Sequence, residues 1–274
     1  MFISNSIKTE VVTITPRLAR KLLEQNTNNR DISPGNLAKI KLIMERGEWE
    51  LNGEAIKIAK NGRILDGQHR LMAAVETATT FSTLIVYGLD DETQETMDSG
   101  KSRTIANVLT LRGYKNAARL ASIVTSIIRE EQWSLKAAAT GSTAYVVTPK
   151  QVVDRLQVEP SLEDLASNVR PLTALLSGRT AGLLYYVLSS VDADDAQYFF
   201  DRLVAGDGME RDNPILVLRN LLMVLKQEKR GVRSQTYVSA LVVKAWNKYR
   251  LGEPVKQLKF TIGGANPESF PEPI

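Results

Sequence analysis

Strand patterns occur only in the first part of this chain, whereas apolar residues at helical spacing fill the part that follows. Short apolar or alternating runs predict strands at residues 11–14, 55–59, 63–65 and 81–87, and an Asn-Gly turn at residues 61–62 predicts that two of them form a hairpin. Beyond residue 104, apolar side chains recur with a 3.6-residue period at 105–111, 117–128, 151–156, 181–191, 196–204, 214–225 and 236–249. This division is typical of an α+β fold.

We therefore expect an α/β domain over residues 1–110, a helical domain over residues 111–251 and an irregular tail over residues 252–274, where glycines and prolines recur. Helices should also begin within the first domain, after Thr15 and Ser33. Each of these residues can cap a helix and is followed by proline, which suits the first helical position. A short acidic helix is expected at residues 90–97.

The composition excludes several classes of site. The 274 residues include no cysteine and one histidine, which excludes disulfides and cysteine nucleophiles and argues against a conventional zinc site. No Gly-x-Ser-x-Gly elbow supports a serine hydrolase. The net charge of +4 permits contact with nucleotides or nucleic acid without requiring it. No apolar run is long enough to span a bilayer and no secretory signal precedes the first domain, so we expect a cytoplasmic protein without a membrane partner.

The single histidine lies in the pentad Asp66-Gly67-Gln68-His69-Arg70, where an expected strand meets an expected helix. A helix N-terminus offers backbone N–H groups to an anion, a glycine allows close approach, and an arginine can bind an oxyanion with two donors. Asp66 would orient Mg²⁺ or accept a proton, while His69 and Arg70 would contact a phosphate. The simpler alternative is that Asp66 only caps the helix and the other side chains are ordinary surface groups.

A second polar turn precedes the helix expected at residues 105–111. Its glycine, hydroxyls and cations suit an anion, and we expect it to form the other wall of the phosphate pocket. The candidate contacts are Ser99, Gly100, Lys101, Ser102, Arg103 and Thr104. The turn is not a P-loop, because Glu95 occupies the position of the first glycine of that motif. The alternative is a basic loop that ends in a hydroxyl cap.

Glu54 is the candidate general base, because it lies beside Gly53 at the start of an expected strand. A solvated carboxylate is the alternative for Glu54, and it is the preferred interpretation for Glu48 and Glu50.

A basic stretch lies between the last two expected helices. Such stretches are usually solvated, but this one is also a candidate for nucleic-acid contact. Its members are Arg219, Lys226, Lys229, Arg230 and Arg233.

The run from Gly62 to Leu71, with the pentad at its centre, resembles the signature of DGQHR-domain proteins in the ParB/sulfiredoxin-like superfamily. Two further motifs are similar to companion motifs of phage and bacterial members: Gly47-x-Trp49-x-x-Asn52-Gly53-Glu54, and the Met97–Thr104 run. The resemblance implies a small mixed-sheet domain that holds a nucleotide phosphate where a strand meets the pentad helix. It makes Asp66, Gly67, His69 and Arg70 nucleotide-binding candidates.

The superfamily includes proteins that hydrolyse CTP, proteins that use ATP and a kinase with an upstream glutamate base, so the resemblance implies hydrolysis of a nucleoside triphosphate or transfer of its phosphate, assisted by Mg²⁺. Sulfiredoxin chemistry is excluded, since it requires a cysteine. Glu54, Asp66 and His69 would then be the catalytic residues, and Asp66 would also bind the metal ion. Gly67 and Gln68 would complete the contacts with the nucleotide.

The alternative is a non-enzymatic DNA-binding regulator. A third interpretation is a phage protein whose helical domain binds a host factor. A homodimer is compatible with each interpretation.

Overall fold

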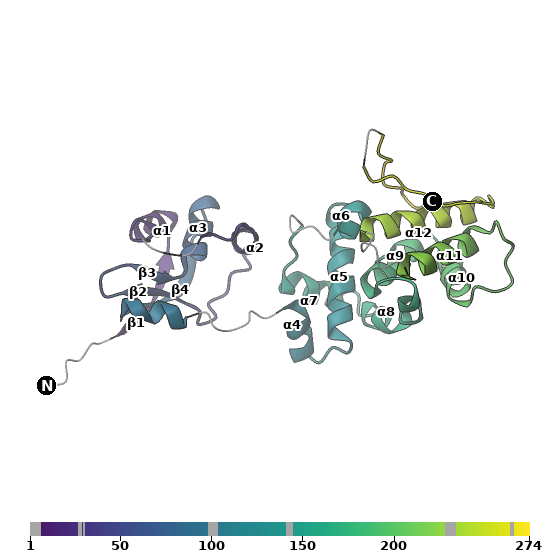
Figure 1. Ribbon diagram of the computed structural model, residues 1–274. Helices are drawn as coiled ribbons and strands as arrows, with labels where there is room; N and C mark the ends of the chain where they lie inside the picture. The colour runs from purple at the N-terminus through teal and green to yellow at the C-terminus, as the bar shows by residue number, and fades with distance from the viewer. Residues whose placement is uncertain are drawn as a thin grey trace. The chain divides into compact units, whose positions relative to one another are not determined.

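The structure, a computed structural model, describes residues 7–26, 29, 31–97, 104–140, 145–227, 234–263 and 266–274. The chain divides into two compact units, Met1–Ser102 and Arg103–Ile274 (Figure 1). The described strands all lie in the first unit, and the second is built from helices. The expected α+β fold class, with strands first and helices after, is confirmed.

The first unit contains a four-stranded mixed sheet with the strand order β1-β4-β2-β3. The outer strands β1 (Lys8–Ile14) and β3 (Ile64–Asp66) run antiparallel to β4 (Phe81–Leu89) and β2 (Ala55–Ala59), respectively. The two central strands, β2 and β4, are parallel to each other. A parallel pair requires a crossover connection, and α3 (Gln68–Glu76) lies within this one.

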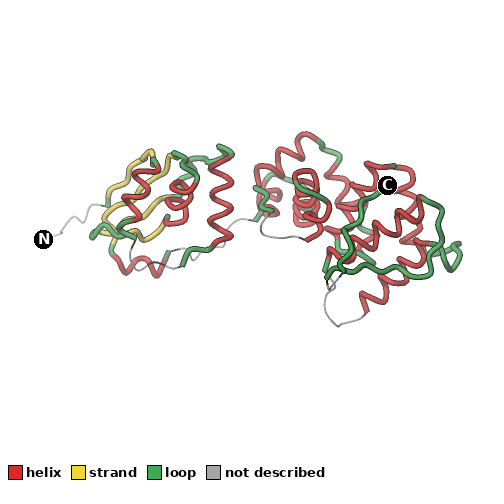
Figure 2. Tube along the Cα trace, turned by 90° about the horizontal axis from the view of Figure 1, so that it is seen from above, coloured by secondary structure: helices red, strands yellow, loops and turns green. Residues whose placement is uncertain are grey.

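Three helices, α1 (Pro16–Leu23), α2 (Pro34–Glu45) and α3, form a layer beside this sheet (Figure 2). α3 contacts both α1 and α2. The helices and strands share one core, whose fully or nearly fully buried members are Ile14, Ala19, Met44, Ile56, Ile58, Ile64, Leu71, Ala73, Ala74, Phe81 and Ile85. This packing fixes the position of α3, and therefore of the pentad, against the central strands.

Side-chain caps start the first two helices where the sequence predicts them. The Thr15 hydroxyl accepts a hydrogen bond from the N–H of Leu18 at 3.2 Å, and the Ser33 hydroxyl accepts one from Asn36 at 3.5 Å. The predicted hairpin joins β2 to β3. The acidic helix predicted at residues 90–97 is a short 3₁₀ helix, η1 (Asp91–Thr96).

The second unit is a helical domain in which α5 contacts α4, α6, α7, α8 and α9. Its helices are α4 (Ile105–Leu111), α5 (Ala117–Gln132), α6 (Leu135–Thr140), α7 (Pro149–Val158), α8 (Leu162–Asn168), η2 (Pro171–Ala174), α9 (Gly178–Val191), α10 (Ala193–Ala205), α11 (Pro214–Gln227) and α12 (Gln235–Arg250). Trp246 is fully buried and packs edge-on against Phe199. Across the described residues, no helix has the length and apolar content needed to cross a membrane.

The structure corrects the expected organisation in two respects. The boundary between the units lies after Ser102 rather than after residue 110, since α4 packs on α5 and belongs to the helical unit. The sequence also failed to predict α6, α8 and η2, which have at most seven residues each.

The described residues beyond α12 form no helix or strand, as expected for the tail. They are nevertheless tied to α12. The Trp246 indole donates to the Ile274 carbonyl at 2.9 Å, and the Asn247 amide donates to the Glu272 carbonyl at 2.8 Å. Leu258 and Phe260 are buried in the helical core.

Asp192 is the N-cap of α10, and its capping interaction is sensitive to acid. Its carboxylate accepts the backbone N–H of Asp195 at 3.0 Å and pairs with Arg250 at 2.9 Å, and these two interactions lower the pKa of Asp192. Because the pKa of Asp192 is lower in the folded state than the ordinary aspartate value of 3.8, the ionised carboxylate stabilises the fold at pH values above 3.8. This stabilisation is lost as the pH falls through the pKa of the folded state.

We expect the Asp192→Asn chain to lose less thermal stability than wild type as pH falls below 3.8. Melting curves followed by circular dichroism at several acidic pH values test this. Asp194→Asn is the control, because it makes the same charge change in the first turn of α10. Parallel pH profiles for wild type and D192N would contradict it.

Candidate functional site

A pocket of about 280 Å³ opens in the first unit where β3 meets α3. This volume is close to the lower end of the range of small-molecule sites. Its lining combines two carboxylates, an imidazole and a guanidinium with amides and apolar groups. The lining residues are Asn36, Ile40, Trp49, Asn52, Glu54, Asp66, Gly67, His69 and Arg70. Five of these were predicted site residues: Glu54, Asp66, Gly67, His69 and Arg70.

Gly67 makes the turn from β3 into α3 with a φ of +104°. A Cβ at this position would lie 2.8 Å from the side chain of Ile56 and 3.3 Å from its Cα. Both the conformation and the close approach therefore require glycine. Gly67 is also the N-cap of α3, and no side chain caps this helix. The alternative in which Asp66 only caps the helix is therefore wrong.

Asp66 is instead held by two cations. Its Oδ2 atom lies 3.2 Å from Lys57 Nζ and 3.4 Å from Arg70 Nη2, and its side chain is only 15% exposed. Lys57 faces Asp66 across the β2–β3 register, and Arg70 lies four residues further along the chain. Two cations around one carboxylate leave this side of the pocket with an excess of positive charge.

Arg70 has a buried donor without a partner. Its Nη2 atom donates to the Ala55 carbonyl at 2.7 Å as well as contacting Asp66. Its Nη1 atom is buried and forms no hydrogen bond with any residue that the structure describes. An unsatisfied buried donor costs about 1–3 kcal/mol, so this atom is a site where an added acceptor would be stabilising.

His69 is buried, and its Nε2 atom accepts the backbone N–H of Ser33 at 3.0 Å. An Nε2 acceptor requires the ring to carry its proton on Nδ1. Because Ser33 is the N-cap of α2, this bond ties the start of α2 to the pentad helix. His69 thus lines the pocket and positions one of its walls.

Gln68 is the one member of the pentad that does not line the pocket. Its Oε1 atom accepts from Asn26 at 3.1 Å. Asn29 continues this network by donating to Asn26 and to the backbone carbonyl of Ile64. Gln94 in turn donates to Asn29 and to the backbone carbonyl of Leu65. The amides therefore brace β3, the strand that delivers the pentad.

Glu54 presents the open carboxylate of the pocket. Its backbone is fixed on both sides: its N–H donates to Asn52 Oδ1 at 3.1 Å, and its carbonyl accepts from the buried Thr83 hydroxyl at 3.1 Å. Its side chain is exposed and has no ion pair with any described residue. A fixed backbone with an uncommitted carboxylate suits a general base.

The sequence analysis did not assign the wall formed by Trp49, Asn36 and Ile40. The Trp49 indole donates to the Ser82 carbonyl at 2.9 Å and packs edge-on against Phe81 with ring centroids 4.9 Å apart. Asn36 and Ile40 lie on α2. Trp49 and Asn52 belong to the motif that precedes Glu54, and this was the available signal for their place in the site.

The second predicted turn is not tested by this geometry. Ser99, Gly100, Lys101, Ser102 and Arg103 lie outside the residues that the structure describes. Thr104 is described and belongs to the helical unit, where it forms a reciprocal cap with Asn107 at the start of α4.

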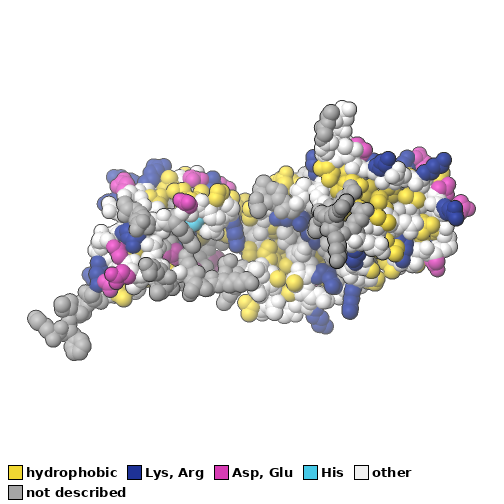
Figure 3. Space-filling view, viewed as in Figure 1, with side chains coloured by type: hydrophobic (Ala, Val, Ile, Leu, Met, Phe, Trp, Pro, Cys, Tyr) yellow, Lys and Arg dark blue, Asp and Glu magenta, His cyan; other side chains and the backbone are white. Residues whose placement is uncertain are grey.

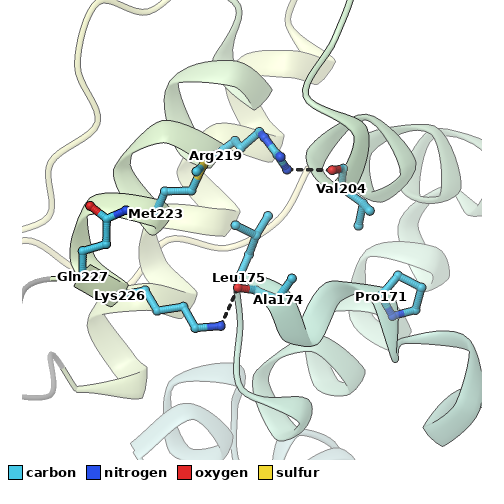
Figure 4. A pocket seen from close by; sticks show the side chains of 8 residues that line it. All are labelled: Pro171, Ala174, Leu175, Val204, Arg219, Met223, Lys226 and Gln227. Carbon is cyan, nitrogen blue, oxygen red and sulfur yellow. Dashed lines mark hydrogen bonds between the residues drawn. The ribbon is translucent and has the colours of Figure 1, made fainter.

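Two members of the predicted basic stretch bind backbone carbonyls at helix ends (Figure 4). Arg219 donates to the Leu203 and Val204 carbonyls at 2.6 and 2.7 Å. Lys226 donates to the Ala174 carbonyl at 2.5 Å. Basic side chains at these ends complement the helix dipole. Lys229, Arg230 and Arg233 lie outside the described residues. On the face drawn in Figure 3, basic side chains of the helical unit are scattered rather than gathered into a stripe.

Within the described residues, no three His, Asp or Glu side chains gather as a metal-binding group. Comparisons of the chain with protein-family models, with curated proteins and with solved structures find no match.

Proposed function

We propose that the pocket at the β3–α3 junction binds a nucleoside triphosphate such as ATP or CTP, and that the chain hydrolyses it or transfers its phosphate. The observation that carries this proposal is the buried Nη1 atom of Arg70, which has no partner among the described residues and belongs to a residue that lines the pocket. A phosphate oxygen would supply the missing acceptor, and arginine is well suited to bind it with two donors.

The residues around the pocket divide between binding and chemistry. Arg70, supported by Lys57, would hold the phosphate, and Gly67 would make the turn that places Arg70 there. Glu54 would accept a proton from the attacking water or hydroxyl, because its carboxylate is not held by an ion pair. His69 would keep α2 in place through its bond to Ser33.

Mg²⁺ fits this site only together with the nucleotide. Mg²⁺ in such sites takes one or two carboxylates and completes its shell with phosphates and water. Asp66, the predicted ligand, is already paired with Lys57 and Arg70, so it would contribute at most one oxygen and the phosphates and water would supply the other ligands. When bound, Mg²⁺ would neutralise part of the phosphate charge.

Glu54→Gln tests the proposed chemistry separately from binding. We expect phosphate release from ATP or CTP to fall by about 100-fold or more, which is the usual contribution of a general base, with nucleotide affinity changed little. Glu50→Gln is the matched control, since Glu50 lies four residues upstream, is exposed and does not line the pocket. Equal release by wild type and E54Q would remove Glu54 from the mechanism.

A further inference from the structure

A second pocket, in the helical unit, contains two arginines that no described carboxylate neutralises. It has a volume of about 260 Å³ and lies along α5 and the start of α9. Ser122, Thr125 and Arg129 follow one another at helical spacing on one face of α5, and Arg179 reaches the same pocket from α9. Thr104, a candidate phosphate contact from the sequence, also lines it from the start of α4, whereas no residue of the β3–α3 pocket does.

Both guanidinium groups are anchored but keep donors available. Arg129 Nε donates to the Tyr145 carbonyl at 2.7 Å. Arg179 Nε donates to the Ser126 hydroxyl at 2.6 Å, and its Nη2 atom donates to the Ala138 carbonyl. Within the described part of the chain, three guanidinium nitrogens form no hydrogen bond: the two Nη atoms of Arg129 and Nη1 of Arg179. The hydroxyl groups of Ser122 and Thr125, which line the same pocket, form none there either. The pocket therefore presents donors without matching acceptors.

Burial places the two positive charges in an unfavourable setting. Burial lowers the pKa of Arg129, and burial together with the nearby charge of Arg129 lowers the pKa of Arg179. Two like charges that are half-buried side by side, without a counter-ion among the described residues, repel each other. A bound anion would remove this repulsion and would also accept the available hydrogen bonds.

We infer that this pocket is a binding site for a terminal phosphate group. A phosphomonoester carries close to two negative charges and three acceptor oxygens, which match two guanidinium groups and two hydroxyls. A carboxylate or a phosphodiester carries one charge and would leave one arginine unneutralised. The inference does not rest on the proposed nucleotide site.

The direct test is an NMR titration of the full ¹⁵N-labelled chain with inorganic phosphate, at ionic strength held constant with chloride. The Nε–H signals of Arg129 and Arg179, identified by their loss in R129K and R179K, should shift and saturate together. The Arg119 signal should not move. Arg119 is the matched control, since it lies on α5 and donates to the Ala166 carbonyl at 2.9 Å but does not line the pocket.

Two variants test the donors. Thr125→Val and Arg129→Gln should each weaken phosphate binding at least about tenfold, the value of one hydrogen bond to a charged group. If R129Q fails to fold by circular dichroism, T125V decides. The inference is overturned if chloride alone gives the same shifts, if Arg119 shifts equally, or if T125V binds phosphate as tightly as wild type.

The source of the phosphate is distinguished by a further titration with one oligonucleotide, with and without a 5′-phosphate. If the phosphorylated oligonucleotide binds more tightly than both inorganic phosphate and the unphosphorylated oligonucleotide, the site is assigned to nucleic-acid ends. Binding no tighter than that of inorganic phosphate assigns it to a small phosphorylated metabolite.

Discussion

Replacing Arg70 by glutamine will weaken nucleotide binding roughly thirtyfold, because hydrogen bonds to a charged group contribute about 2 kcal/mol. The guanidinium is the only group at the pocket with a buried donor that lacks a partner among the described residues. Isothermal titration calorimetry with ATP and with CTP measures the loss. Arg70→Lys keeps the charge but not the paired donors, so we expect an intermediate affinity.

Arg63→Gln is the matched control for this effect. The Arg63 side chain is 13% exposed against 11% for Arg70, and it also pairs with a carboxylate, that of Asp91. It does not line the pocket. Equal losses in R63Q and R70Q would show that general destabilisation of the unit, rather than a phosphate contact, causes the effect.

Gly67→Ala will destabilise the N-terminal unit by about 3 kcal/mol. A non-glycine residue in a left-handed conformation costs about 1–2 kcal/mol, and forcing a methyl group against a packed neighbour adds about 1–3 kcal/mol. The neighbour here is Ile56, which is fully buried and cannot move aside without disturbing the centre of the sheet. Hydrogen exchange of the β2 and β4 amides reports on this unit alone.

Gly62→Ala separates the two causes. Gly62 has a φ of +89°, but a Cβ there would meet no atom within 4 Å, so only the conformational cost of about 1–2 kcal/mol remains. If G67A and G62A destabilise the unit equally, the contact with Ile56 does not constrain the turn.

Signals that are local in the chain were predictable from the sequence. The caps at Thr15 and Ser33 depend on residues three positions away, and the Asn-Gly turn sets its own hairpin. The long helices carry several turns of apolar periodicity. α6 escaped prediction because it is short and because four of its six residues are buried, so that no polar face marks it as amphipathic.

Contacts across the fold were not predictable in the same way. The Lys57–Asp66 ion pair depends on the register between β2 and β3, and the parallel pairing of β2 with β4 depends on where the crossover places α3. The pentad predicted that a site lies at the strand–helix junction. It did not predict that Gln68 faces an amide network or that His69 accepts a backbone N–H, because Asn26 and Ser33 are brought there only by packing.

A thermal titration of the full chain with ATP, CTP and GTP in the presence of Mg²⁺ tests the central claim most directly. A ligand at 100 times its dissociation constant stabilises the folded state by about 2.7 kcal/mol. We predict that at least one of the three raises the melting temperature of the N-terminal unit by several degrees, and that R70Q reduces the shift to about a third while R63Q retains it in full. If none of the three nucleotides changes the melting temperature of the wild-type chain, the proposed nucleotide site is wrong.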